Sequence, residues 1–174
     1  MRKAIMRAVG TLVLVVAATG IVFVVGMRTK SPIVVNGVRR LGRTMRPLAI
    51  RSAGGPGASA SVVHHIGRTS GRPYSTPVGA VPIDDGFVIA LPYGLAADWL
   101  QNVLASGSAT IVHEGTAVEV DRPEVVALSS VEDQFSRGDQ RAHRVFGVAQ
   151  CLRVRRRAAD APDPPDPTIG ERLG

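Results

Sequence analysis

The sequence predicts a small antiparallel β-barrel, a mainly β fold of the α+β class, preceded by one transmembrane helix. An apolar segment of twenty residues lies near the start of the chain, and short β-type runs separated by turn residues follow later. Of the 174 residues, roughly 120 remain once the appendages at both ends are removed, which is enough for one core. About six closely spaced strands with two or three short helices favour a barrel over a parallel sheet.

The chain is expected to have four parts. Residues 1–30 form a membrane anchor with basic flanks, and residues 31–60 form a basic amphipathic helix followed by a Gly/Ser linker. Residues 61–157 form the barrel domain, in which we expect the functional site. The Pro/Asp-rich tail, residues 158–174, is expected to be disordered.

The anchor is expected over Ala8–Met27, a run without an ionisable side chain. At 1.5 Å per residue, such a helix spans about 30 Å, the thickness of the hydrocarbon core. A secretory signal peptide is the main alternative, but its apolar run is usually about 7–15 residues long and ends in small residues. Here the run ends in Val25-Gly26-Met27-Arg28, a poor cleavage site. An interfacial or buried helix is the third interpretation.

The distribution of basic residues predicts which side of the membrane holds the globular domain. The flanking residues are Arg2, Lys3 and Arg7 before the apolar segment, and Arg28, Lys30, Arg39, Arg40, Arg43 and Arg46 after it. Because cytoplasmic flanks carry the excess of Lys and Arg, we expect a single-pass protein with its globular domain in the cytoplasm.

An amphipathic helix is predicted after the anchor and is expected to end near Pro47, which cannot continue a regular helix. Apolar residues recur at steps of three and four, and arginines gather on the opposite side: Val34, Val38, Leu41, Met45 and Leu48 lie opposite Arg39, Arg40, Arg43 and Arg46. Three interpretations stay open: a core-packing helix with a solvated basic face, a helix lying on anionic lipid, or a basic wall facing an anionic cofactor tail.

The strands and turns of the barrel follow from alternating apolar residues and turn-forming pairs. Strands are expected at residues 61–66, 75–83, 86–91, 108–113, 116–121 and 147–154, with hairpin turns at Asp84-Asp85-Gly86 and Glu114-Gly115. Helices are expected at Ala97–Ala105 with Gly107 as its C-cap, from Pro123 to Phe135, and at Gln140–Phe146. In the first strand, one of the adjacent His64 and His65 points inward and the other outward.

Charge is divided unequally along the chain. Residues 1–83 hold twelve Lys/Arg and no carboxylate, a balance of +12, whereas residues 84–174 hold nine Lys/Arg and fourteen Asp/Glu, a balance of −5. This asymmetry predicts an anionic partner for the first half, which could be lipid headgroups, a phosphorylated ligand or nucleic acid. We expect no nucleic-acid partner, because aromatic residues are scarce in the domain and no recognition helix is evident.

Three kinds of catalytic centre are not expected. No Cys/His cluster has the spacing of metal ligands. The single cysteine, Cys151, lies in an apolar run and is expected to be buried and inert. A Ser-His-Asp triad needs a buried acid beside His64 or His65, yet the first carboxylate of the chain is Asp84.

The most informative stretch is Gly67–Pro77, which joins the first two predicted strands. A turn with two glycines lets neighbouring backbone N–H groups point at one anion, while Arg68 and Ser70 add a charge and a hydroxyl. The stretch is neither a Walker P-loop nor a dinucleotide fingerprint, because the Gly-Lys-Ser/Thr spacing and a following helix are both missing. From the residues alone, a phosphate site and an ordinary polar hairpin both stay open.

The segment resembles the deazaflavin-dependent nitroreductase family, whose motif includes Gly-Arg-Lys/Arg-Ser-Gly and a later Pro-Leu. The matching residues are Gly67, Arg68, Ser70, Gly71 and Pro77, and the later strand-loop-helix pattern matches Val88-Ile89-Ala90 and Trp99-Leu100-Gln101-Asn102. The resemblance covers roughly residues 62–154, with a somewhat shortened loop before the tryptophan. Thr69 stands where the family has a second basic residue and Tyr74 where it has an arginine, so fewer phosphate contacts are expected.

The resemblance implies a split β-barrel that binds coenzyme F420, a deazaflavin with a phospholactyl-polyglutamate tail. The residues implied to bind it are Gly67, Arg68, Thr69, Ser70, Gly71, Pro77, Val78, Ala90, Leu91, Trp99 and Asn102. Those of the turn would hold the phosphate, those from the strands would line the ring, and Trp99 with Asn102 would close the ring edge.

The resemblance and the anchor together predict a membrane-tethered oxidoreductase. It would transfer a hydride from the reduced deazaflavin to a lipophilic acceptor such as a quinone, a nitro compound or an unsaturated lipid. An FMN-dependent reductase of the same fold and a non-catalytic coenzyme-binding protein are the alternatives. Tyr74 and Tyr93 are candidate substrate contacts or, alternatively, rim residues of the barrel, and no catalytic residue is assigned. The oligomeric state is left open, with a homodimer among the options.

Overall fold

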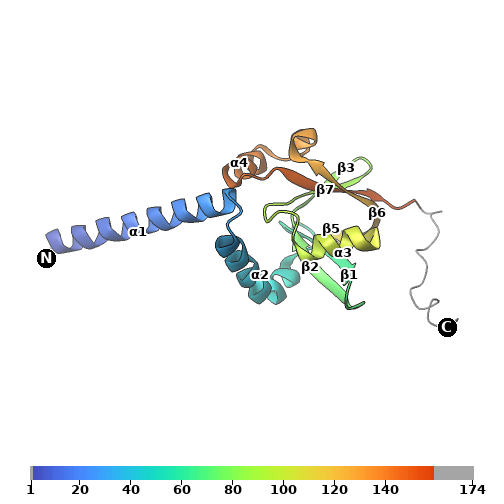
Figure 1. The fold of residues 1–174 in the computed structure, drawn as a ribbon, viewed down its shortest axis with the longest axis horizontal. Coiled ribbons are helices and arrows are strands. Elements are labelled where there is room, and N and C mark those ends of the chain that lie inside the picture. The colour runs from blue at the N-terminus through green and yellow to red at the C-terminus, as the bar shows by residue number, and fades with distance from the viewer. Residues whose placement is uncertain (1, 159–174) are drawn as a thin grey trace.

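The computed structural model describes residues 2–158 (Figure 1). Its elements are α1 (Arg2–Arg28), α2 (Pro32–Ser52), β1 (Ser61–Ile66), β2 (Pro73–Val78), β3 (Ala80–Ile83), β4 (Gly86–Ala90), α3 (Asp98–Ser106), β5 (Ser108–His113), β6 (Thr116–Ala127), the 3₁₀ turns η1 (Leu128–Ser130) and η2 (Glu132–Gln134), α4 (Arg137–Phe146) and β7 (Gln150–Arg156). Residues 159–174, nearly all of the predicted tail, lie outside the described residues.

Helix α1 contains a segment long and apolar enough to cross a membrane. This segment, Val9–Arg28, has a mean hydropathy of 2.5, and almost all of it is exposed. Figure 1 shows α1 standing away from the domain and α2 running across the line of α1 rather than continuing it. The change of direction falls at Lys30, whose φ is 54°, and the Ser31 N–H donates to the Gly26 carbonyl within the turn.

Helix α2 does not end near Pro47, so that prediction is wrong. The helix continues to Ser52, although a proline removes one helical hydrogen bond and crowds the preceding turn. The last turn is held by the rest of the domain, because Ala49 and Ile50 are half-buried there. Tertiary packing has therefore outweighed the local helix-breaking tendency of proline.

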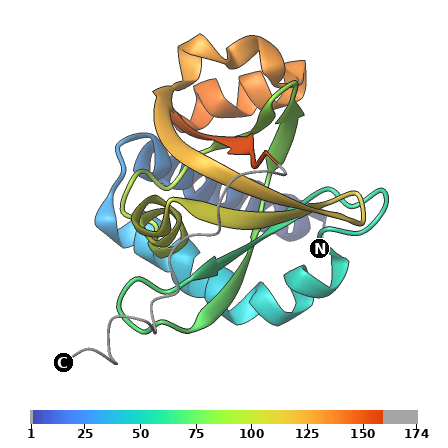
Figure 2. The same cartoon turned by 90° about the vertical axis from the view of Figure 1, so that its right-hand side faces the viewer.

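The seven strands of the described chain form one antiparallel sheet in the order β2-β1-β5-β6-β7-β4-β3. Its two outer strands, β2 and β3, are consecutive in the chain and are separated by Gly79 alone. The sheet must therefore curl until its edges approach each other, and it forms the half-barrel seen in Figure 2. The predicted single strand over residues 75–83 is wrong in this respect, because the chain crosses from one edge to the other at Gly79.

The predicted helix from Pro123 to Phe135 is also wrong. Strand β6 runs through Pro123 to Ala127, and only the two 3₁₀ turns follow before α4. The register between β6 and β7 shifts between Asp121 and Glu124, where Arg122 has a φ of 50°. Such a β-bulge leaves a residue unpaired, so a proline without an N–H is tolerated there.

The other elements lie close to their predicted positions, and the fold class is confirmed. Strands β1 and β5 have the predicted bounds, while β7 begins at Gln150 rather than at residue 147. Helix α3 ends at Ser106, followed by Gly107 with a φ of 72°, as expected of a left-handed C-cap. Helix α4 begins at Arg137, earlier than predicted, because the Ser136 hydroxyl accepts a hydrogen bond from the Asp139 N–H.

Two apolar clusters lie on opposite faces of the curled sheet. The inner cluster fills the half-barrel and packs against α3, with Val63, Phe87, Ile89, Leu100, Val103, Ile111, Val120, Leu152 and Val154 among its members. The outer cluster lies under the 3₁₀ turns and α4 and contains Val88, Leu128, Val131, Phe135, Val148 and Cys151. Neighbouring residues of β4 and β7 thus enter different clusters, as the alternation of side chains along a strand requires.

Candidate functional site

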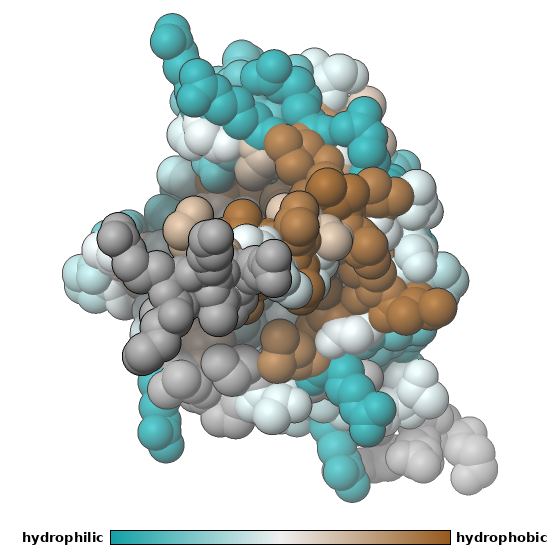
Figure 3. All heavy atoms as spheres, turned by 90° about the vertical axis from the view of Figure 1, so that its left-hand side faces the viewer, coloured by the Kyte–Doolittle hydropathy of each residue, from teal (hydrophilic) through white to brown (hydrophobic). Residues whose placement is uncertain are grey.

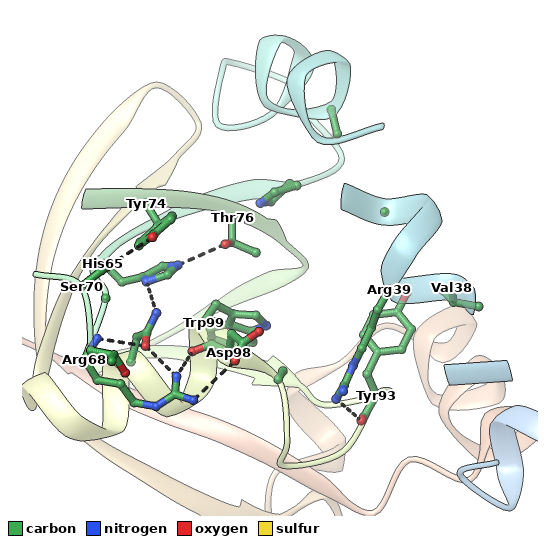
Figure 4. A pocket seen from close by; sticks show the side chains of 17 residues that line it. Val38, Arg39, His65, Arg68, Ser70, Tyr74, Thr76, Tyr93, Asp98 and Trp99 are labelled. Carbon is green, nitrogen blue, oxygen red and sulfur yellow. Dashed lines mark hydrogen bonds and ion pairs between the residues drawn. The ribbon is translucent and has the colours of Figure 1, made fainter. Parts of the chain in front are cut away.

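A cleft of about 720 Å³ opens between the β1–β2 turn, the start of α3, the loop after β4 and helix α2 (Figure 4). It is lined by seven of the eleven residues implied to bind the coenzyme and by both candidate tyrosines: Gly67, Arg68, Thr69, Ser70, Pro77, Trp99 and Asn102, with Tyr74 and Tyr93. The structure therefore brings together residues from four separate parts of the sequence.

The remaining predicted residues lie beside this cleft. Val78, Ala90 and Leu91 line an adjoining hollow of about 230 Å³, which shares Pro77, Tyr93, Ala97 and Trp99 with the cleft. Gly71 lines neither space. With a φ of 63°, it instead closes the turn, and its N–H donates to the Gly67 carbonyl at 2.8 Å.

The β1–β2 turn has two backbone donors that no group of the described chain accepts from. Its ends are fixed by the Gly71 bond and by the Gly67 N–H, which donates to the Arg72 carbonyl at 2.9 Å. Among the described residues, the backbone N–H groups of Thr69 and Ser70 have no acceptor. Neighbouring N–H groups in such a turn form a concavity suited to an anion.

Gly67 is required by close packing within the turn. A Cβ at this position would lie 2.5 Å from Ser70 Oγ and 2.7 Å from Tyr74 Cε2. The Ser70 and Tyr74 hydroxyls lie 3.2 Å apart and share a hydrogen bond. The absence of a side chain at Gly67 therefore lets these two polar groups sit against the backbone at the rim of the cleft.

Arg68 anchors the turn to helix α3. Its backbone N–H donates to Asn102 Oδ1 at 3.2 Å, and its guanidinium Nη1 donates to the same oxygen at 2.8 Å. The guanidinium also meets Asp98, at 3.4 Å from Oδ1, and 40% of the Arg68 side chain remains exposed. An exposed ion pair of this kind is weak, so an anionic ligand can share or replace the carboxylate.

Asn102 connects the turn to a buried histidine. Because its Oδ1 already accepts from two Arg68 donors, its Nδ2 is the atom that faces His65 Nδ1, at 3.2 Å. His65 Nδ1 therefore accepts, and the ring proton lies on Nε2, which donates to Thr76 Oγ1 at 3.1 Å. The chain Arg68–Asn102–His65–Thr76 thus links α3, β1 and β2, as the dashed lines of Figure 4 show.

The other end of the cleft is apolar and aromatic. Trp99, at the start of α3, lies near Tyr93 and Pro77, and the described wall of α2 adds Val38 and small residues. The cleft therefore has a polar end, where Arg68 is paired with Asp98, and a mainly apolar, aromatic end. Such a cavity suits a flat ring that carries an anionic tail.

Helix α2 also contributes a cation to the cleft. Arg39 is half-buried, lines the cavity, and donates from Nη2 to the Tyr93 carbonyl at 3.1 Å (Figure 4). Its Nε is buried and has no partner among the described residues. Arg39 thus forms part of the cleft wall, whereas on the same helix Val35 is buried and Leu41 is 63% exposed.

Asp98, which pairs with Arg68, and two further polar groups of the cleft were missed from the sequence. His65 and Thr76 were not predicted, because alternation along β1 says only that one of two adjacent histidines points inward. The structure places His65 inside, 7% exposed and stacked on Tyr74 with ring centroids 5.8 Å apart, whereas His64 is exposed. The apolar Val63 and the small Gly67 lie two positions to either side of His65, and this period-two spacing could have predicted that His65 points inward.

The remaining chemistry-bearing residues lie away from the cleft. Cys151 is fully buried in the outer cluster, which confirms the expectation that it is buried, and burial raises the pKa of its thiol to about 11. His113 Nδ1 is hydrogen-bonded to the Ser61 hydroxyl at 2.8 Å. The described residues contain no group of His, Cys, Asp or Glu able to hold a metal ion.

Comparison with known proteins adds little to this geometry. No protein-family model and no curated protein matches the chain. Among the solved structures that match is one described as a domain-swapped dimer, with 12% identity and a TM-score of 0.40 over 70% of this chain and 98% of its own. At this TM-score, nothing about the function or assembly of this chain follows from the likeness.

Proposed function

We propose that this protein is a membrane-tethered oxidoreductase that uses a reduced deazaflavin, coenzyme F420, to reduce a lipophilic acceptor. The observation that supports the proposal most directly is the division of the cleft. One end presents two unpaired N–H groups and Arg68, and the other presents Trp99, Tyr93 and Pro77. A phosphate-bearing ring coenzyme has the same division into an anionic tail and a flat apolar part.

The residues present fit such a group. The β1–β2 turn would hold the phosphate through the N–H groups of Thr69 and Ser70 and the charge of Arg68, while Arg39 supplies a second positive charge beside Tyr93, at the other end of the cleft. The adjoining hollow beside Val78 extends the apolar wall. When bound, the coenzyme would supply a hydride from its reduced ring carbon.

The chain itself would contribute orientation and exclusion of water. The Arg68–Asn102–His65–Thr76 network fixes the turn relative to α3, so the anionic tail would be held at a defined distance from Trp99. Orientation of two reactants against a dry apolar wall is the main requirement of hydride transfer. His65 is bound at both ring nitrogens, so it is not available as a general base in this arrangement.

A membrane location favours a lipophilic electron acceptor. Helix α1 is long and apolar enough to span a bilayer, and the lysine and arginine distribution favours a cytoplasmic domain. A site tethered at a membrane encounters molecules concentrated in the lipid. The acceptor is therefore a quinone, a nitro compound or an unsaturated lipid rather than a hydrophilic metabolite.

Coenzyme binding tests the proposal first. The full chain in detergent is titrated with oxidised deazaflavin and, separately, with FMN, and binding is followed by fluorescence. Replacing Arg68 with alanine should weaken deazaflavin binding by about 1–3 kcal/mol, because a charge-assisted contact to phosphate is lost. The matched control is Arg141→Ala, which removes the same charge from the exposed face of α4 and should leave affinity unchanged.

The titrations distinguish the alternatives. Preferential FMN binding would favour an FMN-dependent reductase, and binding of neither compound would overturn the proposal. Oxidation of reduced deazaflavin with menadione then separates an enzyme from a carrier. Tight binding without acceptor-dependent oxidation would indicate a coenzyme-binding protein.

A further inference from the structure

The root of helix α1 is fixed to the globular domain rather than joined by a free linker. Phe23 packs edge-on against Phe146 of α4, with ring centroids 6.2 Å apart. The Arg28 guanidinium donates to the Arg144 carbonyl at 3.0 Å, and the Lys30 ammonium donates to the Pro92 carbonyl at 2.9 Å. The direction of α1 therefore determines which face of the domain would meet a bilayer that α1 crosses.

Helix α2 lies along this same face. It begins directly after the turn at Lys30 and runs across the line of α1, so it would lie near the plane of the membrane surface if α1 crossed the membrane (Figure 1). Two apolar side chains of α2 point away from the domain: Ile33 is 86% exposed and Leu41 is 63% exposed. A helix with unburied apolar residues beside a spanning helix has the features of an interfacial helix.

Exposed apolar and basic residues continue onto the neighbouring elements. Val145 of α4 and Leu95 of the loop after β4 are also exposed, and Arg144 is an exposed cation next to Arg28. Figure 3 looks onto this face along α1, so the brown apolar side chains over its middle include those of α1 itself, with teal hydrophilic residues above and below them. We call Ile33, Arg40, Leu41, Leu95, Arg144 and Val145 the root surface.

We infer that the root surface rests on the headgroup layer of an anionic phospholipid bilayer, with its apolar side chains inserted and its arginines among the phosphates. This inference rests on the anchoring role of α1 in the proposed function. Charge supports it, because residues 1–83 carry no carboxylate and each cation near an anionic surface adds to the attraction. The nearest acidic residue on α4, Asp139, is engaged with the Ser136 hydroxyl at its helix start.

A second copy of the chain is a less suitable occupant of the root surface. Helix α1 leaves the domain between α4 and α2, so a partner would have to pack around it (Figure 1). Two such faces would also bring like-charged arginines together, which opposes association. A lipid surface requires neither arrangement.

This placement determines how an acceptor reaches the cleft. Tyr93 is partly exposed and lines the cleft, and its backbone carbonyl is held by Arg39 of α2, while the preceding carbonyl is held by Lys30. Burial lowers the pKa of Lys30, in keeping with its position beneath this loop. The cleft wall and the root surface thus share α2 and the loop after β4. The acceptor enters from the lipid at headgroup level.

Site-specific labelling of the full chain in nanodiscs tests the inference. Leu41→Cys is labelled with an environment-sensitive fluorophore, and quenching by spin-labelled phospholipid is measured. Buried Cys151, with its raised pKa, does not compete for the reagent. The matched control is Asp84→Cys, an exposed position in the turn beside the end of β7, on the side of the domain away from α1 (Figure 1).

Several-fold stronger quenching at position 41 than at position 84 is expected, and it should decrease when phosphatidylglycerol is replaced by phosphatidylcholine or when Arg40→Gln is introduced. A label at position 41 that stays in water, while a Val16→Cys label in α1 is quenched, would overturn the inference. Concentration-dependent shielding of position 41 in detergent would point to a second copy instead. A water-exposed label at position 16 would contradict both the membrane-spanning role of α1 and the docking of the root surface on lipid. No coenzyme is present, so failure of hydride transfer does not affect the result.

Discussion

The two faces of the curled sheet bury very different kinds of side chain. The outer face, under the 3₁₀ turns and α4, buries Phe135, Val148 and Cys151 and has no buried hydrogen-bonded side-chain pair of its own in the described chain. The inner face carries the apolar interior of the half-barrel but also buries three hydrogen-bonded polar residues: Ser61 at the start of β1, and His65 and Asn102 where β1 meets α3. The cleft lies beside His65 and Asn102, where β1 meets α3.

The difference shows where burial of polar side chains makes the stability of the fold depend on particular hydrogen bonds. A buried polar group is tolerated only when its hydrogen bonds are made, and an unmade bond leaves a desolvation penalty of about 1–3 kcal/mol. An apolar pair would pack the same space without that risk. The polar network therefore serves the position of the β1–β2 turn, whereas the outer face serves stability alone. Separate mutations should affect stability and binding separately.

The largest effect is expected from Gly86→Ala at the start of β4. A Cβ there would clash with the Val154 carbonyl and approach the Arg155 Cα at 2.8 Å, and backbone atoms cannot turn aside as side chains can. We expect a loss of about 3 kcal/mol in the free energy of unfolding, with coenzyme affinity retained by the protein that stays folded. Denaturant unfolding in detergent measures it. A wild-type unfolding midpoint would show that β4 and β7 adjust freely.

Asn102→Ala should reduce both stability and binding. The substitution leaves His65 Nδ1 and the Arg68 N–H without their partner, so a loss of about 1–3 kcal/mol in unfolding free energy is expected. The turn also loses its attachment to α3, and deazaflavin affinity should fall with it. Gln101→Ala, which removes an amide from the partly buried neighbouring position, is the control. Equal effects of both variants would contradict a special role for the network.

Gly67→Ala should show the opposite pattern to Gly86→Ala: a small loss of unfolding free energy and a large loss of coenzyme affinity. The added Cβ meets only the ends of the Ser70 and Tyr74 side chains, which can rotate away, so stability should fall by less than about 1 kcal/mol. Their movement displaces the rim of the cleft, and we expect roughly tenfold weaker coenzyme binding, equivalent to about 1.4 kcal/mol. Titration and unfolding are measured on the same preparation. A stability loss as large as that of Gly86→Ala would remove the contrast between the faces.

Local signals were sufficient for part of the fold. Period-two alternation and turn pairs placed β1 and β5, and Gly107 marked the end of α3. The spacing of apolar residues after Pro123 imitated a helix, but Val125 packs on the inner cluster and Val126 on the outer one, which is the alternation of a strand. The bulge that admits the proline depends on pairing with β7 and has no local signature.

The candidate site shows the same limit. The two glycines of the turn and Arg68 could be singled out from composition and from the family resemblance. The break at Gly79 could not, because it results from the approach of the two sheet edges rather than from a local preference. Arg39 reaches the cleft only because α2 folds back against the loop after β4. Contacts between distant segments therefore determine most of the cleft wall.

The smallest expected effect is the contribution of His143 to the pH dependence of stability, which tests how completely water is excluded from the outer face. His143 of α4 packs edge-on against Phe135 at 4.8 Å, and burial lowers its pKa below 6.5, an effect only partly opposed by Asp139 and Glu132. The unfolded chain then binds a proton more readily than the folded one. The stabilisation is complete above pH 6.5 and decreases as the pH falls through the folded-state pKa. We expect His143→Asn to reduce the loss of thermal stability between pH 7.5 and pH 5, measured beside wild type in the same buffers. An identical pH profile in wild type and His143→Asn would mean that water reaches this imidazole, and the outer face would then be less completely packed than the half-barrel interior.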